Sequence, residues 1–167
     1  DSAVGTQEEN NLRHLSTNLG TDVVHSRVVP FLTSKHSLEF CLSYAEHAAQ
    51  EGFPSLVVLG GDRTVGRARS VEHAWQLRQQ IRQRVPGLSL GGWANPYGDA
   101  RQQAGFVEDP SFTAEYYLTQ IVSHLDPSPV ARFLDEVARR RVSRDGRRDV
   151  GARRDSRQRR RAAQVGL

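Results

Sequence analysis

The chain has 167 residues, of which 37% are hydrophobic and 25% are charged, a composition typical of a water-soluble globular protein. No apolar run approaches the length of about 20 residues that a membrane helix needs, and the N-terminus lacks a signal-peptide pattern. We therefore expect a cytoplasmic protein with no membrane partner. Cys41 is the only cysteine, which excludes a disulfide framework and a cysteine-based zinc site. The chain starts at Asp1 and contains no methionine, so we expect a processed product or part of a longer protein.

The formal net charge of +4 conceals two different parts. Residues 139–167 contain 12 arginines and 3 aspartates, whereas residues 1–138 contain 11 basic and 16 acidic residues. We predict a folded domain over 1–138 and an Arg-rich tail over 139–167. Three interpretations of the tail stay open: a disordered arm that binds RNA or another polyanion by counterion release, a basic helix that extends a helix at 130–141, or out-of-frame translation of a GC-rich gene. Alternative reading frames of GC-rich genes contain many arginine codons, which favours the third interpretation.

The first half of the chain predicts two helices and two strands. We expect an amphipathic helix at about 8–19 and a strand that is rich in β-branched residues at 23–32. From Ser37 the apolar residues follow a helical period, and Ser37 can cap this helix while Gly52 can end it. The predicted apolar stripe consists of Leu38, Cys41, Leu42, Ala45, Ala48 and Ala49. The run LVVL at 56–59 predicts a strand that is buried on both faces.

The second half continues the alternation. We expect a helix from about Ser70, with Val71, Ala74, Leu77 or Arg78, Ile81 and Val85 along its apolar side. A strand at 88–90, a weakly patterned helix at 100–108, a strand at 116–122 and a helix from about Pro129 should follow.

Strands that alternate with helices predict a parallel sheet, either doubly wound and open or closed into a (β/α)₈ barrel. Four residues lie at or just past the apolar runs, namely Thr33, Asp62, Trp93 and Gln120, and 29, 31 and 27 residues separate them. A barrel uses about 31 residues for each strand–helix unit and carries its chemistry at the carboxyl ends of its strands. The spacing and the placement of these residues therefore favour the TIM barrel over the doubly wound sheet.

Asp62 is the leading candidate for chemistry. It follows Gly60 and Gly61, which allow a ligand to approach the backbone. Its carboxylate can accept hydrogen bonds from a heterocycle or hold a cation, but it can equally cap a turn or helix. The two glycines Gly61 and Gly66 have P-loop spacing, but Arg67 and Ala68 stand where Lys and Ser/Thr are required, which argues against a nucleoside triphosphate site.

Two further loops carry candidate residues. Trp93 and Tyr97 can stack on a planar cofactor or simply pack against the barrel rim. Gln120 interrupts an apolar strand, so it needs a partner if it faces the barrel interior and none if it faces outward. The six histidines show no ligand-like spacing, so we expect no metal site. Another barrel chemistry, such as that of a phosphate-binding isomerase or an aldolase, is an alternative, and we expect no lysine at a strand end for a Schiff base.

Four segments together resemble methylenetetrahydrofolate reductase, a flavin-dependent (β/α)₈ barrel. They are VVPFLTS at 28–34, SLVVLGGD at 55–62, LSLGGWANPYGDA at 88–100 and YYLTQ at 116–120, and their order and spacing agree with the family over about residues 1–138. The resemblance implies reduction of 5,10-methylenetetrahydrofolate to 5-methyltetrahydrofolate in one-carbon metabolism and methionine biosynthesis, by hydride from an FAD that NADH or NADPH has reduced.

The resemblance also assigns roles to residues. It implies that Gly61 and Asp62 contact the flavin, that Asp62 tunes hydride transfer and also faces the folate, and that Gln120 binds the folate and the nicotinamide in turn. It places Trp93, Tyr97 and Ala100 at the flavin. It further implies that the full-length parent can form homo-oligomers.

The chain departs from the family pattern at several places. Phe31 stands where the family has a histidine, Gly60 stands where it has an arginine, and no lysine that contacts the flavin phosphates is evident around Asp109. These departures predict weaker flavin binding. By this resemblance the chain forms a partial TIM barrel that comprises about strands three to six. It lacks the general-acid glutamate that the family carries on strand one, so we expect it to be inactive alone.

Overall fold

The computed structural model describes residues 11–20, 23, 27–109, 112 and 114–141, and the predicted tail beyond residue 141 lies outside this part of the chain. The chain divides into two compact units. The first comprises Asp1–Asn95 and Asp109–Ile121, and the second comprises Pro96–Glu108 and Val122–Leu167.

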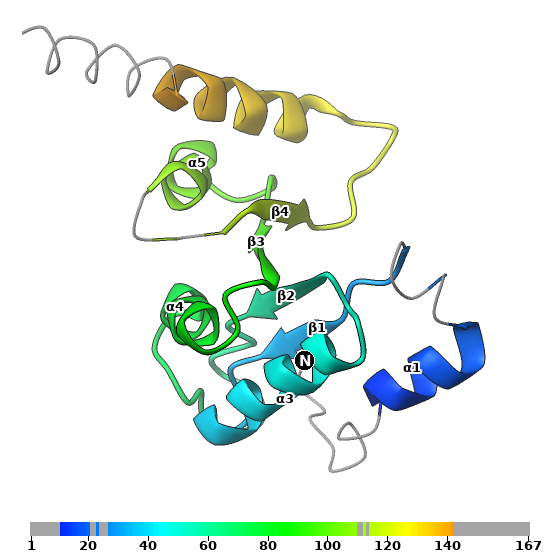
Figure 1. Ribbon diagram of the computed structural model, residues 1–167. Helices are drawn as coiled ribbons and strands as arrows, with labels where there is room; N and C mark the ends of the chain where they lie inside the picture. The colour runs from blue at the N-terminus through cyan, green and yellow to red at the C-terminus, as the bar shows by residue number, and fades with distance from the viewer. Residues whose placement is uncertain (1–10, 21–22, 24–26, 110–111, 113, 142–167) are drawn as a thin grey trace, which may run out of the picture. The chain divides into compact units, whose positions relative to one another are not determined.

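The first unit contains a parallel sheet whose four strands follow one another in sequence order, β1-β2-β3-β4 (Figure 1). The strands are β1 (Phe31–Thr33), β2 (Ser55–Leu59), β3 (Ser89–Ala94) and β4 (Tyr116–Thr119). The predicted α/β class with parallel pairing is confirmed. Within the described residues, β1 and β4 each pair on one side only.

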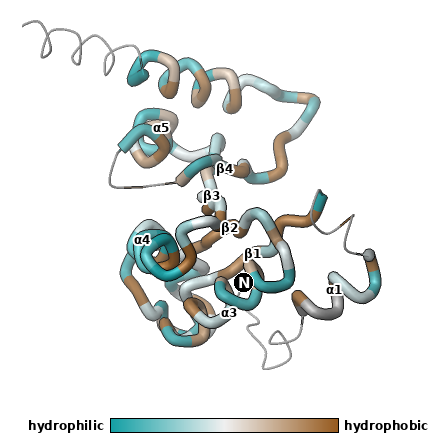
Figure 2. Tube along the Cα trace, in the orientation of Figure 1, coloured by the Kyte–Doolittle hydropathy of each residue, from teal (hydrophilic) through white to brown (hydrophobic). Residues whose placement is uncertain are grey.

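Helices α3 (Leu38–Gln50) and α4 (Ala74–Arg84) cover one face of this sheet. Their buried side chains form a single hydrophobic cluster with strand residues Leu32, Leu56, Val58 and Leu90, and β2 is among the most hydrophobic segments in Figure 2. Successive strand residues alternate between faces, so Phe31, Val57, Gly91 and Trp93 belong to the opposite face. Sequential strand order with both crossover helices on one face is compatible with a segment of a barrel.

Helix α3 begins as predicted. The Oγ atom of Ser37 accepts a hydrogen bond from the Phe40 N–H at 3.2 Å, and Gly52 takes a positive φ of 83° just beyond the end of the helix. The buried positions are Cys41, Tyr44, Ala45 and Ala48. Tyr44 was missing from the predicted stripe, and Ala49, which was included, is exposed.

Helix α4 begins later than predicted, at Ala74 rather than near Ser70. The reason is tertiary: the N–H and Oγ of Ser70 both donate to the Ser34 carbonyl, at 2.6 and 2.9 Å, which holds Ser70 outside the helix. His73 then precedes the helix, and its N–H donates to Gln76 Oε1 at 2.9 Å. A third helix of this unit, α1 (Asn11–Leu19), contributes Leu12 to the hydrophobic cluster.

Two predicted strands are too long. The strand expected at 23–32 starts only at Phe31: Val23 and Arg27 are helical, and residues 24–26 lie outside the described part of the chain. Pro30 has no N–H to donate and contributes only its carbonyl, which accepts from the Val57 N–H at 2.9 Å. The strand expected at 116–122 ends at Thr119, where its partner β3 also ends. The strand predicted at 88–90 is instead β3, which runs on to Ala94.

Two glycines of β3 make room for the tyrosines of β4. A Cβ atom on Gly91 would lie 2.5 Å from the Tyr116 ring, and one on Gly92 would lie 2.5 Å from the Tyr117 ring. These residues are direct neighbours in the sheet, since Gly91 pairs with Tyr116 and Gly92 with Tyr117. Only a residue without a side chain fits beside a ring at this separation.

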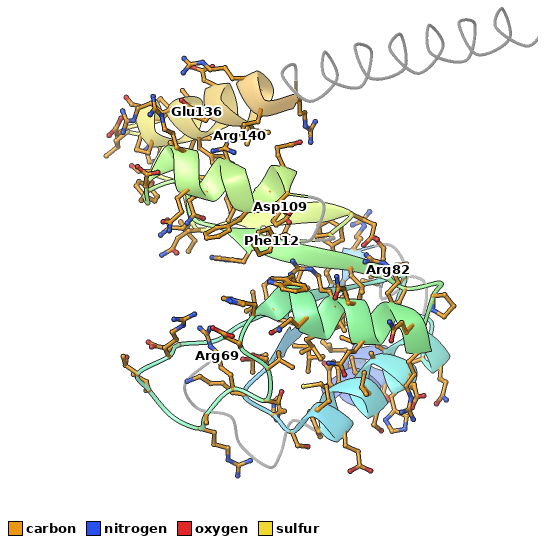
Figure 3. The ribbon with its side chains drawn as sticks, turned by 90° about the vertical axis from the view of Figure 1, so that its left-hand side faces the viewer. Arg69, Arg82, Asp109, Phe112, Glu136 and Arg140 are labelled. Carbon is orange, nitrogen blue, oxygen red and sulfur yellow. The ribbon has the colours of Figure 1, made fainter. Side chains whose placement is uncertain are left out.

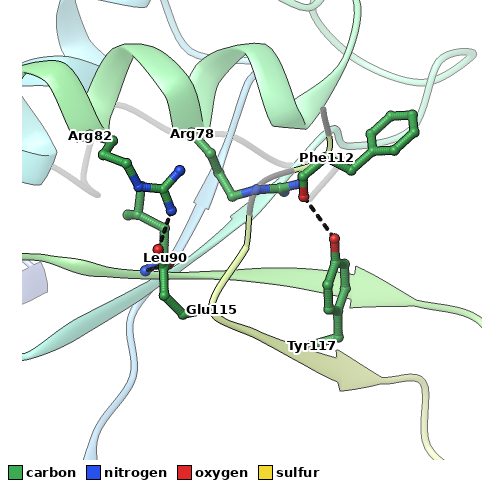
Figure 4. Close-up of polar contacts among 6 residues, drawn as sticks. All are labelled: Arg78, Arg82, Leu90, Phe112, Glu115 and Tyr117. Atoms are coloured by element: carbon green, nitrogen blue, oxygen red, sulfur yellow. Dashed lines mark hydrogen bonds and ion pairs between the residues drawn. The ribbon is translucent and has the colours of Figure 1, made fainter. Parts of the chain in front are cut away.

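A polar cluster joins α4 to β3 and to the segment before β4 (Figure 4). Glu115 pairs with Arg82 through Oε1 and accepts the Leu90 N–H through Oε2 at 2.7 Å. Nearby, the carbonyl of Phe112 accepts hydrogen bonds from Arg78 at 3.2 Å and from Tyr117 at 2.8 Å. Arg78 is buried, and this burial lowers its pKa.

The second unit contains α5 (Ala100–Glu108), as predicted, and a helix over residues 128–141. The Arg140 guanidinium donates to the Arg101 carbonyl at 3.0 Å, and Arg141 Nε donates to Glu108 Oε1 at 2.6 Å. The 128–141 helix runs across the predicted boundary at 138/139, so the first arginines of the predicted tail belong to it. None of the helices in the described ranges has the length and apolarity to cross a membrane.

Candidate functional site at the carboxyl ends of the strands

The carboxyl ends of parallel strands meet at one edge of a sheet, and the described part of the first unit places several candidates there. Thr33 is the last residue of β1, Asp62 lies in the loop after β2, and Gln120 directly follows β4. Trp93 lies inside β3 rather than after it. The other two predicted flavin residues, Tyr97 and Ala100, belong to the second unit.

Hydrogen bonds join the turn after β1 to the loop after β2. The Ser34 N–H donates to the Leu59 carbonyl at 2.9 Å, and Ser34 Oγ donates to the Gly60 carbonyl at 3.0 Å. The Ser34 carbonyl in turn accepts both hydrogen bonds from Ser70. Residues that are far apart in sequence therefore hold the Gly60–Asp62 segment in place.

Gly61 is required by the local geometry. Its φ of 72° lies in the left-handed region, and a Cβ atom there would be 2.7 Å from Thr33 Oγ1 and 3.0 Å from the Lys35 side chain. The space above this glycine is thus filled by the chain itself. Its presence is explained by internal packing, without reference to a ligand.

Asp62 is exposed and caps its own turn. Its Oδ1 atom accepts hydrogen bonds from the N–H and the hydroxyl of Thr64, both at 2.9 Å. These hydrogen bonds lower the pKa of the Asp62 carboxyl, and the positive charges of Lys35 and Arg69 act in the same direction. The turn-capping role considered for this residue is real. Its Oδ2 atom has no partner in the described part of the chain, so one carboxylate oxygen stays available to accept an N–H from a heterocycle.

Trp93 is partly exposed, and its ring meets Phe31 edge to face, with centroids 6.2 Å apart and planes at 68°. Packing, one of the two roles considered for Trp93, therefore covers part of the surface of its ring. Tyr97 accepts a hydrogen bond on its hydroxyl from the Ser123 N–H at 2.8 Å, and Ala100 is the first residue of α5.

Gln120 is exposed, and its N–H donates to the Ala94 carbonyl at 3.2 Å. It was expected inside a strand, but it follows the strand. Because the Gln120 side chain is exposed, it does not need a hydrogen-bond partner inside the protein.

Sequence reasoning missed Lys35, the only lysine of the chain. The expectation that no lysine lies at a strand end is wrong, because Lys35 lies two residues beyond β1 and is 2% exposed. Its Nζ atom is buried and makes no hydrogen bond within the described residues. The signal available in the sequence was its position: a single lysine among 22 arginines, just after the first strand.

Two further side chains, those of Cys41 and His36, carry groups that can react or bind metals when they are accessible. Cys41 is fully buried, and this burial raises the pKa of its thiol to about 12, against the weaker opposing effect of a hydrogen bond with Ser70. His36 is also buried and stacks on Phe40, with ring centroids 4.3 Å apart. Among the described residues, no three histidine, cysteine, aspartate or glutamate side chains gather as metal ligands would.

No protein-family model matches this chain, and a comparison with curated protein sequences found no match.

Proposed function

We propose that this chain is part of a folate oxidoreductase of the methylenetetrahydrofolate reductase type, and that the carboxyl edge of its sheet binds a flavin and a folate. The observation that supports this best is the position of Asp62. It follows Gly60 and Gly61 at the carboxyl end of β2, in a sheet whose sequential strand order is compatible with a barrel segment. This is where the four segments that resemble the family require an aspartate.

The residues present are suited to a flavin edge. The free Oδ2 of Asp62 would accept an N–H of the flavin pyrimidine ring and later of the pterin, and the lowered pKa keeps this carboxylate charged. The amide of Gln120 would bind the folate, and Trp93 would border the flavin. Tyr97 and Ala100, which the resemblance also assigns to the flavin, belong to the second unit. The bound flavin would accept hydride from NADH or NADPH and pass it to the folate.

Titration of the purified chain with FAD and with 5-methyltetrahydrofolate tests this proposal. We expect quenching of flavin fluorescence on binding and a loss of FAD affinity of about tenfold in Asp62→Asn, which replaces a charged acceptor with a neutral one. Asp126→Asn is the matched control, because Asp126 is also exposed and accepts the N–H two residues on, from Ser128 at 3.1 Å.

The control variant should bind FAD like the unaltered chain. Failure of both FAD and the folate to bind at millimolar concentration would refute the proposal, and so would equal FAD affinities of the two variants. We further predict that the chain alone does not oxidise NADH with menadione or folate as acceptor. Measurable turnover would contradict that prediction.

A further inference from the structure

The loop after β2 carries an excess of positive charge. Residues 60–70 include Arg63, Arg67 and Arg69 but only one acidic residue, Asp62. Lys35 adds a fifth charged group from the turn after β1, and its side chain lies against the backbone of this loop. The carboxyl edge between β1 and β2 is therefore cationic.

Lys35 is the most unusual of these groups. Its Nζ atom is buried, and no described residue offers it a hydrogen-bond acceptor. A buried ammonium group without a partner is unfavourable, because it loses its water and gains nothing in exchange. An anion bound from solution would compensate it.

Arg69 presents a second donor of the same kind. Its guanidinium donates to the carbonyls of Gly61 and Glu72, the latter at 3.3 Å, but its Nε is buried and has no acceptor in the described part of the chain. In Figure 3 it lies in the loop between β2 and α4.

Lys35 and Arg69 lie against two adjacent residues, Gly61 and Gly60. A Cβ atom on Gly61 would lie 3.0 Å from Lys35 Cε, and a Cβ atom on Gly60 would lie 3.2 Å from Arg69 Cζ. Both cations also help to lower the pKa of Asp62, behind the larger effect of Thr64. Two buried donor atoms without a partner in the described residues, Lys35 Nζ and Arg69 Nε, thus occur within one short stretch of the sheet edge.

We infer that Lys35 and Arg69 form a binding site for a phosphoryl group beside the Gly60–Asp62 segment, in addition to the flavin and folate contacts proposed above. Two positive charges suit a dianion such as a phosphate or pyrophosphate better than a single carboxylate, and Arg and Lys are the usual phosphate ligands. The site does not use the incomplete P-loop motif, because its lysine comes from the neighbouring turn. Since Nζ is not exposed, the loop at 60–70 must move for the anion to reach it.

Because the chain has one lysine, amine labelling reads a single side chain besides the N-terminus. We expect inorganic pyrophosphate to slow the labelling of Lys35 at least tenfold, as measured by mass spectrometry, and ADP to do the same. Sodium chloride at equal ionic strength should not slow it. Citrate, which tests carboxylates, should protect at least tenfold less well than pyrophosphate.

A charge-matched pair of variants provides a second measurement. Lys35→Met should lower pyrophosphate affinity in calorimetry at least tenfold, whereas Arg67→Gln, which removes a charge from an exposed position of the same loop, should change it less than threefold. Equal effects of the two variants, protection by citrate as strong as that by pyrophosphate, or no binding by the unaltered chain below about 10 mM would overturn the inference. If Lys35→Met does not fold, the labelling experiment on the unaltered chain decides.

Discussion

Replacement of Gly91 by alanine tests the packing between β3 and β4. The new Cβ atom would lie 2.5 Å from Tyr116 Cε2, 2.6 Å from Cζ and 2.9 Å from Val57 Cγ2. Carbon atoms pack best at about 3.5–4.0 Å, so the Tyr116 ring has to move by about 1 Å. Overpacking of this kind costs about 1–3 kcal/mol. Because Val57 is fully buried and blocks retreat on one side, we expect a loss of about 2 kcal/mol.

The assay is urea and thermal unfolding followed by circular dichroism. For a chain of this length a loss of about 2 kcal/mol lowers Tm by about 4–8 °C. Gly87→Ala is the control, since no atom lies within 4 Å of a Cβ placed there, and it should change stability by less than about 0.5 kcal/mol.

A double variant identifies the cause. Leucine lacks the Cε2 and Cζ atoms of Tyr116, so Gly91→Ala should destabilise a Tyr116→Leu background by at least about 1 kcal/mol less than it destabilises the unaltered chain. The reasoning is refuted if Gly91→Ala leaves Tm unchanged or if the two substitutions add.

Three further predictions follow from local contacts. Ser37→Ala should lower the free energy of unfolding by about 1 kcal/mol in urea denaturation, because the first turn of α3 loses its cap, and Ser37→Asp should restore most of it. Glu115→Ala should lower the free energy of unfolding by about 1–3 kcal/mol, because the Leu90 N–H loses its acceptor. Glu115→Gln keeps an acceptor and loses only the partly exposed ion pair with Arg82, at a cost below about 1 kcal/mol. Equal losses for the two variants would contradict this account. Cys41 should react with a thiol reagent at pH 8 about a thousandfold more slowly in the native chain than in urea, because burial raises its pKa to about 12. Because the thiol has a higher pKa in the folded state, its contribution to stability is complete below the unfolded pKa of about 9 and is lost as the thiol ionises in the unfolded chain. The free energy of unfolding should therefore fall as the pH rises from about 9 towards 12. Cys41→Ser should not show this fall.

Local patterns predicted much of the fold. The helical period and cap of α3, the buried run of β2 and the short helix α5 are all readable within a dozen residues, because helix periodicity, capping and strand burial depend on near neighbours. The alternation of these elements also predicted the parallel sheet. Asp62 was recognised because a carboxylate after two glycines at a strand end is visible in sequence.

The strand boundaries could not be predicted in this way. A strand continues only while a neighbouring chain offers hydrogen bonds, so β4 ends with β3 at Thr119, and the apolar Ile121 beyond it is exposed. Helix α4 starts late for a similar reason, since Ser70 is held by Ser34, a residue 36 positions away.

The sequence by itself determined most element types, the α/β class and the position of the candidate site at the strand ends, because these depend on periodicity and on short-range chemistry. Only the tertiary structure decided that Lys35 and Arg69 each bury a donor atom that no described residue pairs, beside Gly60 and Gly61, and that Gly91 and Gly92 make room for two tyrosine rings. Burial and close approach are properties of segments that the chain brings together from distant positions, and no local pattern carries them.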